Sequence, residues 1–347
     1  SGGLDSSSIT FLADQIIRES GNNTESLVTV SNVYKNKKYS YCDESSFIDS
    51  MLNFLDIQGF KSEPDDTQLG QKNDYGLWCN ENCYDFLSVA ATNTFEICKR
   101  NNIKVNLDGQ GADETNAGYL RYWRNFFAMQ SFDKDYLVSL FFAPVNLRQK
   151  IRSVFRIDST STPGSILENR FKIKINDESR AKRVIKNMYV GVTVNKALYN
   201  SITFNLKNLL RNIDSNSMAN SIESRQPFMD YRLMTFLNSI PSNYKLHKGW
   251  TKYLARIAFK DKLPENVVWR KDKLGWPQPS RSWISGSFGL EAWNAIKKSR
   301  FLEDFLDCKI LDDDLPSIKN IPRPFFRLYN LARHYEIFFN RQNKFIG

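Results

Sequence analysis

Two glycine-rich segments carry the residue types best suited to chemistry. The chain opens on Ser1-Gly2-Gly3-Leu4-Asp5-Ser6-Ser7 and runs directly into a helical pattern. Glycines let a backbone approach a phosphate closely, serine hydroxyls add donors, and a helix N-terminus presents unpaired N–H groups. Asp5 repels bare phosphate but can bind it through Mg²⁺. We therefore predict that this loop binds ATP phosphates and pyrophosphate through Ser1, Gly2, Gly3, Asp5, Ser6 and Ser7; the alternative is an ordinary Gly/Ser turn with a capping serine.

The second segment is Asp108-Gly109-Gln110-Gly111-Ala112-Asp113-Glu114, directly after a predicted strand. Open α/β sheets place ligands at the carboxyl ends of their strands. Asp5 and Asp113 would then lie at one sheet edge and could hold Mg²⁺ between themselves and pyrophosphate oxygens. Gly109 and Gly111 are predicted to contact the nucleotide, and Asp108 and Gln110 are candidate catalytic residues. A solvated acidic turn is the alternative.

The elements that must position these loops alternate strand and helix over the first 120 residues, which favours βαβ units and a parallel sheet flanked by helices. Strands are predicted at 27–34 and 103–107, and helices at 6–19, 43–55 and 88–99. Apolar stripes define the predicted inward faces of the first two helices: Ile9, Leu12, Ala13, Ile16 and Ile17 in one, Phe47, Ile48, Met51, Leu52 and Leu55 in the other.

The remainder of the chain is predicted to be mainly helical. We divide one synthetase domain, 1–347, into an α/β nucleotide-binding layer at 1–125 and a mainly helical part at 126–347. A loop is expected at 158–163, helices through 180–262 with breaks at Pro227 and Pro241, and a last helix at 323–339. The segment 271–279 holds two prolines and a glycine, so no regular helix is expected there.

Two downstream segments join the glycine-rich ones. In 217–230, Glu223, Arg225 and Asp230 are placed on a helix ending at Pro227. They could form a buried ion-pair network shaping a pocket, or a structural corner that holds the helical part onto the sheet. In 263–276, Lys273 lies in an irregular loop between Trp269 and Gly275.

These four segments, in this order, resemble the glutamine-hydrolysing asparagine synthetase family, specifically its C-terminal ATP-pyrophosphatase domain. SGGLDSS is similar to the superfamily's pyrophosphate-binding loop, and LDGQGADETNAGY to the family's second signature. SGGLDSS is not a Walker A loop, which would need G-K-[ST]. The segment 263–276 matches the family's lysine element with one extra residue before Lys273. The resemblance covers nearly the whole chain and implies an adenine nucleotide alpha hydrolase-like fold.

The resemblance implies a ligase of asparagine biosynthesis that uses ATP and Mg²⁺. The side-chain carboxylate of aspartate attacks the α-phosphorus of ATP, giving β-aspartyl-AMP and pyrophosphate, and ammonia then releases AMP and asparagine. By this resemblance Lys273 reaches the phosphates, where a fixed cation stabilises developing charge, and adenine lies near Val30 and Asn32. Family members draw ammonia from glutamine through an N-terminal glutaminase domain, which we expect to be missing because the chain opens on the motif without an initiator Met. A cytoplasmic enzyme is implied, and a homodimer is left open.

Two departures from the family pattern and two alternative functions stay open. Gln110 stands where many asparagine synthetases have glutamate, and a neutral amide cannot act as a general base. The segment 81–91 lacks the Thr and Arg of some asparagine synthetases, so the carboxylate could differ, as in β-lactam synthetases or lasso-peptide cyclases. A tRNA-modifying ATP-pyrophosphatase shares the first loop but does not explain the second, and a non-catalytic domain would not need Asp5, Asp113 and Lys273.

The composition limits the class of protein and the kinds of partner that this chain can have. The chain has 347 residues, 41% hydrophobic and 25% charged, the balance of a globular protein. Its net charge of +10 is spread without a compact basic tract, so we expect no nucleic-acid partner. Neither a long apolar run nor a signal peptide is visible, and we expect no membrane partner. Five cysteines with only two histidines predict reduced thiols rather than a disulfide framework or zinc site.

Overall fold

The N-terminal part is a parallel β-α-β unit preceded by a helix. The computed structural model describes residues 2–21, 27–64, 66–83, 87–129, 134–147, 150, 191–271, 278–304 and 322–340. Helix α1 (Leu4–Glu19) leads to strand β1 (Val28–Asn32), and helix α2 (Ser45–Leu55) connects it to strand β2 (Gln58–Ser62). The two strands pair in parallel from Val28 opposite Gln58 to Asn32 opposite Ser62. Short 3₁₀ turns follow each strand, η1 (Lys37–Cys42) and η2 (Asp66–Gln68).

A second parallel pair carries the second glycine-rich loop. Helices α3 (Leu69–Asn80) and α4 (Val89–Arg100) precede strand β3 (Val105–Leu107), and helix α5 (Ala112–Thr115) follows it. The partner of β3 is β4 (Glu223–Arg225), more than a hundred residues later in the chain. In the described residues the strands thus form two separate parallel pairs rather than one sheet. The predicted α/β class with parallel strands and flanking helices is confirmed, and the parallel strands of the part described form two small pairs.

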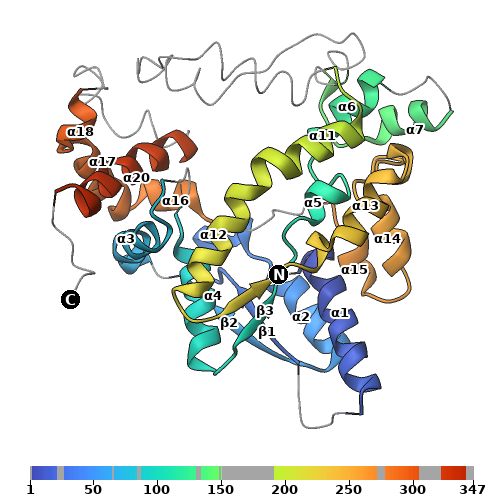
Figure 1. The fold of residues 1–347 in the computed structure, drawn as a ribbon, viewed down its shortest axis with the longest axis horizontal. Coiled ribbons are helices and arrows are strands. Elements are labelled where there is room, and N and C mark those ends of the chain that lie inside the picture. The colour runs from blue at the N-terminus through green and yellow to red at the C-terminus, as the bar shows by residue number, and fades with distance from the viewer. Residues whose placement is uncertain are drawn as a thin grey trace.

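The helical remainder surrounds these strands (Figure 1). Helices α6 (Tyr122–Met129) and α7 (Lys134–Phe142) lie beside a long rod made of α11 (Val194–Asn200), the π-helical η3 (Ser201–Leu206) and α12 (Lys207–Met218). After β4 come η4 (Pro227–Met229), α13 (Tyr231–Ser239), η5 (Ser242–Tyr244), α14 (Tyr253–Phe259) and α15 (Glu265–Val268). The last helices are α16 (Ser280–Ser285), α17 (Ser287–Lys297), α18 (Arg300–Glu303) and α20 (Pro322–Phe338), gathered on the side opposite α13–α15. The predicted final helix is confirmed within one residue; the predicted loop at 158–163 lies outside the described residues.

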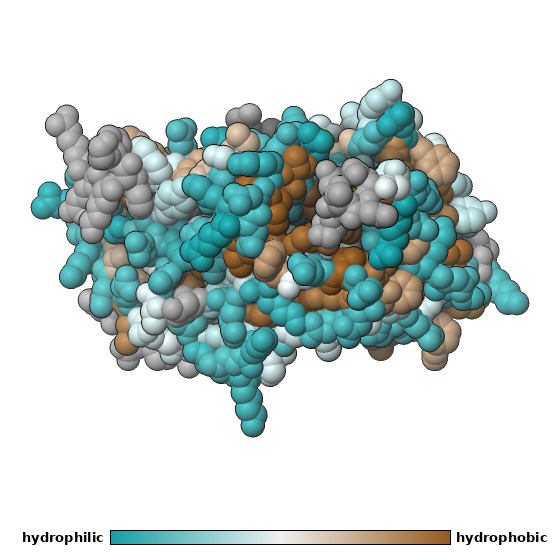
Figure 2. All heavy atoms as spheres, turned by 90° about the horizontal axis from the view of Figure 1, so that it is seen from below, coloured by the Kyte–Doolittle hydropathy of each residue, from teal (hydrophilic) through white to brown (hydrophobic). Residues whose placement is uncertain are grey.

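Hydrophobic side chains form several clusters between these layers. The largest joins α16, α17 and α20 to residues after β1, and includes Trp283, Trp293, Phe325 and Tyr329. A second, rich in aromatic rings, buries Tyr122 and Trp123 with Phe126, Phe127 and Tyr136. The face seen from below is hydrophilic around its rim, with hydrophobic residues across its middle (Figure 2). No helix among the residues described is long and apolar enough to cross a membrane.

Helix α1 departs from its predicted inward face. Ile9 is buried, but Leu12 and Ile16 are exposed by 44% and 66%. The buried side chains are instead Leu4, Asp5, Ser7, Ser8, Ile9 and Asp14. The helix therefore turns its polar N-terminal end into the protein, which a rule based on apolar periodicity does not anticipate. Helix α2 behaves as predicted: Ile48, Met51 and Leu55 are buried.

Candidate active site

The first glycine-rich loop forms the N-terminus of α1. Gly3 is the N-cap in an extended conformation, and no side chain caps the helix. The hydroxyls of Ser6 and Ser8 donate to the carbonyl oxygens of Gly3 and Asp5, at 3.2 and 2.8 Å. The hydroxyl of Ser7, by contrast, is buried with no hydrogen-bond partner among the described residues. A buried, unsatisfied hydroxyl at an uncapped helix N-terminus is suited to an anionic oxygen. Ser1 lies outside the described residues.

The second loop turns at the end of β3 and touches the first. The Asp108 amide donates to the Arg225 carbonyl at 2.9 Å, which extends the ladder with β4 by one bond. Gly111 then takes φ +91° as the N-cap of α5, a conformation that favours glycine. At Gly109 an added Cβ would lie 3.1 Å from the Cβ of Asp5. The structure therefore brings the two predicted loops into contact.

Lys252 joins the two loops. Its ammonium contacts Asp5 Oδ2 at 2.5 Å and also forms an ion pair with Asp113 Oδ1. The lysine side chain is only 3% exposed, and the two carboxylates 11% and 20%. Asp5 and Asp113, predicted as a pair, are thus held together by one buried cation. The sequence analysis missed Lys252, because nothing in its spacing distinguishes it among 48 Lys and Arg residues.

The backbone around Lys252 is shaped to place that side chain. Lys252 has φ +53°, uncommon for a residue with a Cβ. Arg256, in the next helical turn, donates from Nε to the Thr251 carbonyl at 2.8 Å and stacks on the Trp250 ring. Burial lowers the pKa of Arg256 to about 10, against the opposing effect of the Asp5 charge. Gly118 leaves room for the ion pair between Lys252 and Asp113, because a Cβ at this position would lie 1.8 Å from Asp113 Oδ1 and 2.3 Å from Lys252 Cε.

Two carboxyl groups of the second loop, those of Asp108 and Glu114, are desolvated by burial. Burial raises the pKa of Asp108 above its ordinary value; a 2.7 Å hydrogen bond from the Gln110 amide opposes this shift, and the Asp5 charge adds to it. Burial likewise raises the pKa of Glu114, although Tyr119 donates to its Oε1 at 2.9 Å. Desolvated carboxyl groups with raised pKa values are typical of functional sites.

The fourth segment begins at this site. The Arg270 guanidinium forms a buried ion pair with Glu44 at 2.7 Å, with exposures of 4% and 3%. It also donates to the Gly2 carbonyl at 3.4 Å and lies over the Phe47 ring. Arg270 therefore ties the start of the lysine element to the first loop. Lys273 and Gly275 lie outside the described residues, so the predicted role of Lys273 stays a prediction.

The third segment differs from its prediction. Residues Glu223–Arg225 form strand β4 rather than the end of a helix. Glu223 and Arg225 pair with each other in solvent, both 59% exposed, and Asp230 pairs with Arg232. The buried ion-pair network is therefore wrong. The structure agrees better with the structural alternative, because this segment adds a strand beside β3.

The predicted adenine neighbours lie on β1. Val30 packs against a cluster that includes Phe95 and Ile213. The Asn32 amide donates to Thr94 Oγ1 at 2.9 Å, while its carbonyl oxygen is buried without a partner among the described residues. An unpaired acceptor suits an amino group of a base, but adenine contact stays a prediction.

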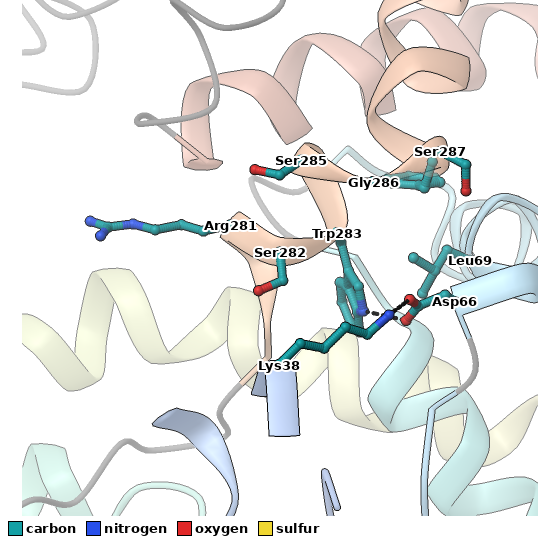
Figure 3. Close-up of a pocket in the computed structure, with 10 residues that line it drawn as sticks. Lys38, Asp66, Leu69, Arg281, Ser282, Trp283, Ser285, Gly286 and Ser287 are labelled. Atoms are coloured by element: carbon teal, nitrogen blue, oxygen red, sulfur yellow. Dashed lines mark hydrogen bonds and ion pairs between the residues drawn. The ribbon is translucent and has the colours of Figure 1, made fainter. Parts of the chain in front are cut away.

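A separate cavity of about 400 Å³ shares no residue with this site (Figure 3). Asp66 lies at its edge, where it accepts from Lys38 at 2.5 Å and from Trp283 Nε1 at 3.2 Å. Arg281 points away from that pair. Lys38, Asp66 and Trp283 are therefore engaged with each other.

Potential metal ligands are few. Within the described ranges, no group of three or more His, Cys, Asp or Glu side chains is arranged to hold a metal ion. Asp5 and Asp113 offer two carboxylates, and Mg²⁺ commonly completes such a site with substrate phosphates and water. Cys42, Cys79, Cys83 and Cys98 are free thiols; Cys308 is not among the described residues.

Comparison with known proteins decides the family. The asparagine synthase family model matches residues 1–319. The chain belongs to the asparagine synthase family. It is 30% identical over 224 residues to "Asparagine synthetase [glutamine-hydrolyzing] 1" of Bacillus subtilis, covering 58% of this chain and 35% of that protein. Over 335 residues it is 24% identical to "Amidase chry2" of Gibberella zeae, covering 82% of this chain and 49% of that one. A putative asparagine synthetase of Mycobacterium tuberculosis is 26% identical over 220 residues, covering 55% of this chain and 32% of its own length. The chain thus spans about a third of the length of these two synthetases.

Proposed function

We propose that this chain is an ATP-dependent amide-forming synthetase that makes asparagine. It adenylates the side-chain carboxylate of aspartate with release of pyrophosphate, and ammonia then displaces AMP. The observation that carries this proposal is the meeting of Asp5 and Asp113, from two separate glycine-rich loops, on one buried cation. Two loops that close on one place can hold the β- and γ-phosphates while the bond to the α-phosphorus breaks.

The residues of the site fit Mg-ATP. Asp5 and Asp113 present the carboxylate oxygens that Mg²⁺ prefers, and the hydroxyl of Ser7 is buried and unsatisfied. Gly2, Gly3 and Ser6 lie in the same loop, and Gly109 and Gly111 allow close approach of the second one. When bound, Mg-ATP supplies an electrophilic α-phosphorus and a good leaving group. Lys252, and Lys273 by family resemblance, supply positive charge for the phosphate oxygens.

Asp108 is the group we assign to the amide-forming half of the reaction. Ammonia loses a proton when it becomes an amide, and Gln110 cannot accept one. Asp108 lies two residues away, and burial raises its pKa above that of an ordinary aspartate, which makes it the better base. The backbone N–H of Gln110 donates a hydrogen bond to Oδ1 of Asp108 and so holds this carboxylate in place.

Product analysis tests the reaction class. With Mg-ATP, aspartate and ammonium, we expect AMP and pyrophosphate in equal amounts; ADP as the product would rule out the proposal. Asp5→Asn and Asp113→Asn should each abolish pyrophosphate release. Asp261→Asn, at an exposed position, is the matched control and should retain it.

The carboxylate and the nitrogen source are tested separately. Pyrophosphate release across a panel of carboxylates, aspartate first, identifies the acceptor, and a different preferred acid would make the chain a related amide- or ring-forming synthetase. The isolated chain should use free ammonia; a glutaminase domain, supplying ammonia from glutamine, is proposed as its partner in a longer protein. A tRNA filter-binding assay addresses the remaining alternative, and we expect no retention.

A further inference from the structure

Lys252 occupies the place where a metal ion bridging one oxygen of Asp5 and one oxygen of Asp113 would lie. Its ammonium contacts one oxygen of Asp5 at 2.5 Å and one oxygen of Asp113. Mg²⁺ binds oxygens at about 2.0–2.1 Å. An ion at that distance from both oxygens would overlap with the ammonium that contacts both. The bridging lysine and a metal ion that bridges the same two oxygens are therefore mutually exclusive.

The two carboxylates need a cation in either arrangement. Both side chains are largely buried, with exposures of 11% and 20%, and like charges this close repel strongly when desolvated. Lys252 is held where it can neutralise both, by a left-handed backbone and by Arg256 bracing the preceding turn. Metal cannot enter unless the ammonium moves, and a buried ammonium needs a new anionic partner.

Nucleotide phosphates are the partner that the site can offer. In the described residues the protein itself presents two carboxylates here, too few to coordinate Mg²⁺ without additional oxygens. Triphosphate oxygens satisfy both requirements at once, since they complete the metal shell and accept the released ammonium. Metal alone can complete its shell with water, but it offers the displaced ammonium no anionic partner.

Resting on the proposed function, we infer that Lys252 is a resident cation that competes with Mg²⁺ for Asp5 and Asp113, so that the metal binds only together with the nucleotide. The exchange moves the ammonium from the aspartates to the phosphates. It also keeps the site from being filled by divalent ions in the absence of ATP.

Binding of Mn²⁺, followed by the loss of its free-ion EPR signal, tests this coupling without turnover. Wild-type protein should bind Mn²⁺ at least tenfold more tightly with α,β-methylene-ATP than without it. Lys252→Met should bind Mn²⁺ without nucleotide at least tenfold more tightly than wild type does, and adding Asp5→Asn should remove that gain. Lys260→Met, which removes an exposed lysine just after α14, is the matched control and should behave as wild type.

The wild-type measurements can overturn the inference even if Lys252→Met unfolds in a thermal melt. Equal Mn²⁺ affinity with and without nucleotide, or tight binding of Mn²⁺ alone, overturns the coupling. Failure of the proposed function looks different: no pyrophosphate release with any carboxylate, while Lys252→Met still gains nucleotide-free Mn²⁺ binding. Equal nucleotide-free affinities in a folded Lys252→Met and wild type also overturn the inference.

Discussion

Replacing Gly118 with alanine should disable the site without touching a charged residue. The added Cβ would lie 1.8 Å from Asp113 Oδ1 and 2.3 Å from Lys252 Cε. To reach ordinary contact at 3.4 Å, the carboxylate oxygen must withdraw by about 1.6 Å and the lysine carbon by about 1.1 Å. Misplacement of about 1 Å can reduce the rate about 100-fold. We therefore expect kcat/KM for pyrophosphate release to fall at least about 100-fold, or about 2.7 kcal/mol of transition-state stabilisation.

The same substitution should have a limited effect on folding. Overpacking a tight position costs about 1–3 kcal/mol, so the variant should remain folded at low temperature, where circular dichroism and pyrophosphate release are measured together. Gly70→Ala is the matched control, because its Cβ would meet only the end of the flexible Glu291 side chain at 3.1 Å and the Tyr329 hydroxyl at 3.5 Å. Wild-type pyrophosphate release by folded Gly118→Ala would show that the contact of Asp113 with Lys252 has no part in nucleotide chemistry.

Three further predictions concern neighbouring groups. Ser7→Ala should leave stability unchanged or slightly higher, because it removes an unsatisfied buried hydroxyl, yet raise KM for Mg-ATP about tenfold; an unchanged KM would remove Ser7 from the phosphate site. Glu44→Gln should lower the free energy of unfolding in urea by about 3–5 kcal/mol, because it removes the negative charge that pairs with the buried Arg270 guanidinium, while exposed Glu303→Gln should not. Asp108→Asn should be more stable than wild type at pH 7. Because the pKa of Asp108 is raised in the folded state, the stability of the wild type falls as pH rises through that pKa. The difference in free energy of unfolding between variant and wild type should therefore grow with rising pH and vanish in acid. Melting curves across pH check this, and the variant should also lose ammonia-dependent AMP release.

Local pattern predicted the elements whose own residues determine them. Helix α2 combines a clear apolar stripe with a start near Asp43, and its predicted inward residues include the three that are buried. The second loop was placed correctly at the end of β3, because strand, glycines and carboxylates are contiguous in the sequence.

What failed depended on distant partners. Strand β4 consists of three polar residues with little intrinsic β preference; it is extended because β3 lies beside it and exchanges backbone hydrogen bonds from Lys104 to Asp108. Lys252 belongs to the site only because the chain returns to the first loop after almost 250 residues. Neither the pairing of β4 with β3 nor the contact of Lys252 with the first loop produces a periodic pattern in the sequence. Local spacing therefore could not have predicted either one.

Three features that weaken the fold lie at the site. The Ser7 hydroxyl is buried without a partner, Lys252 takes a left-handed backbone conformation, and Asp108 is desolvated near Asp5. Exposed pairs such as that between Arg232 and Asp230 follow ordinary surface behaviour by comparison. Selection for stability alone would remove each of the three. All three lie where two glycine-rich loops meet, and a binding site for a charged ligand commonly departs from the rules of stability in this way. Substitutions that relieve them should therefore move stability and activity in opposite directions, which a purely structural role for these residues would not produce.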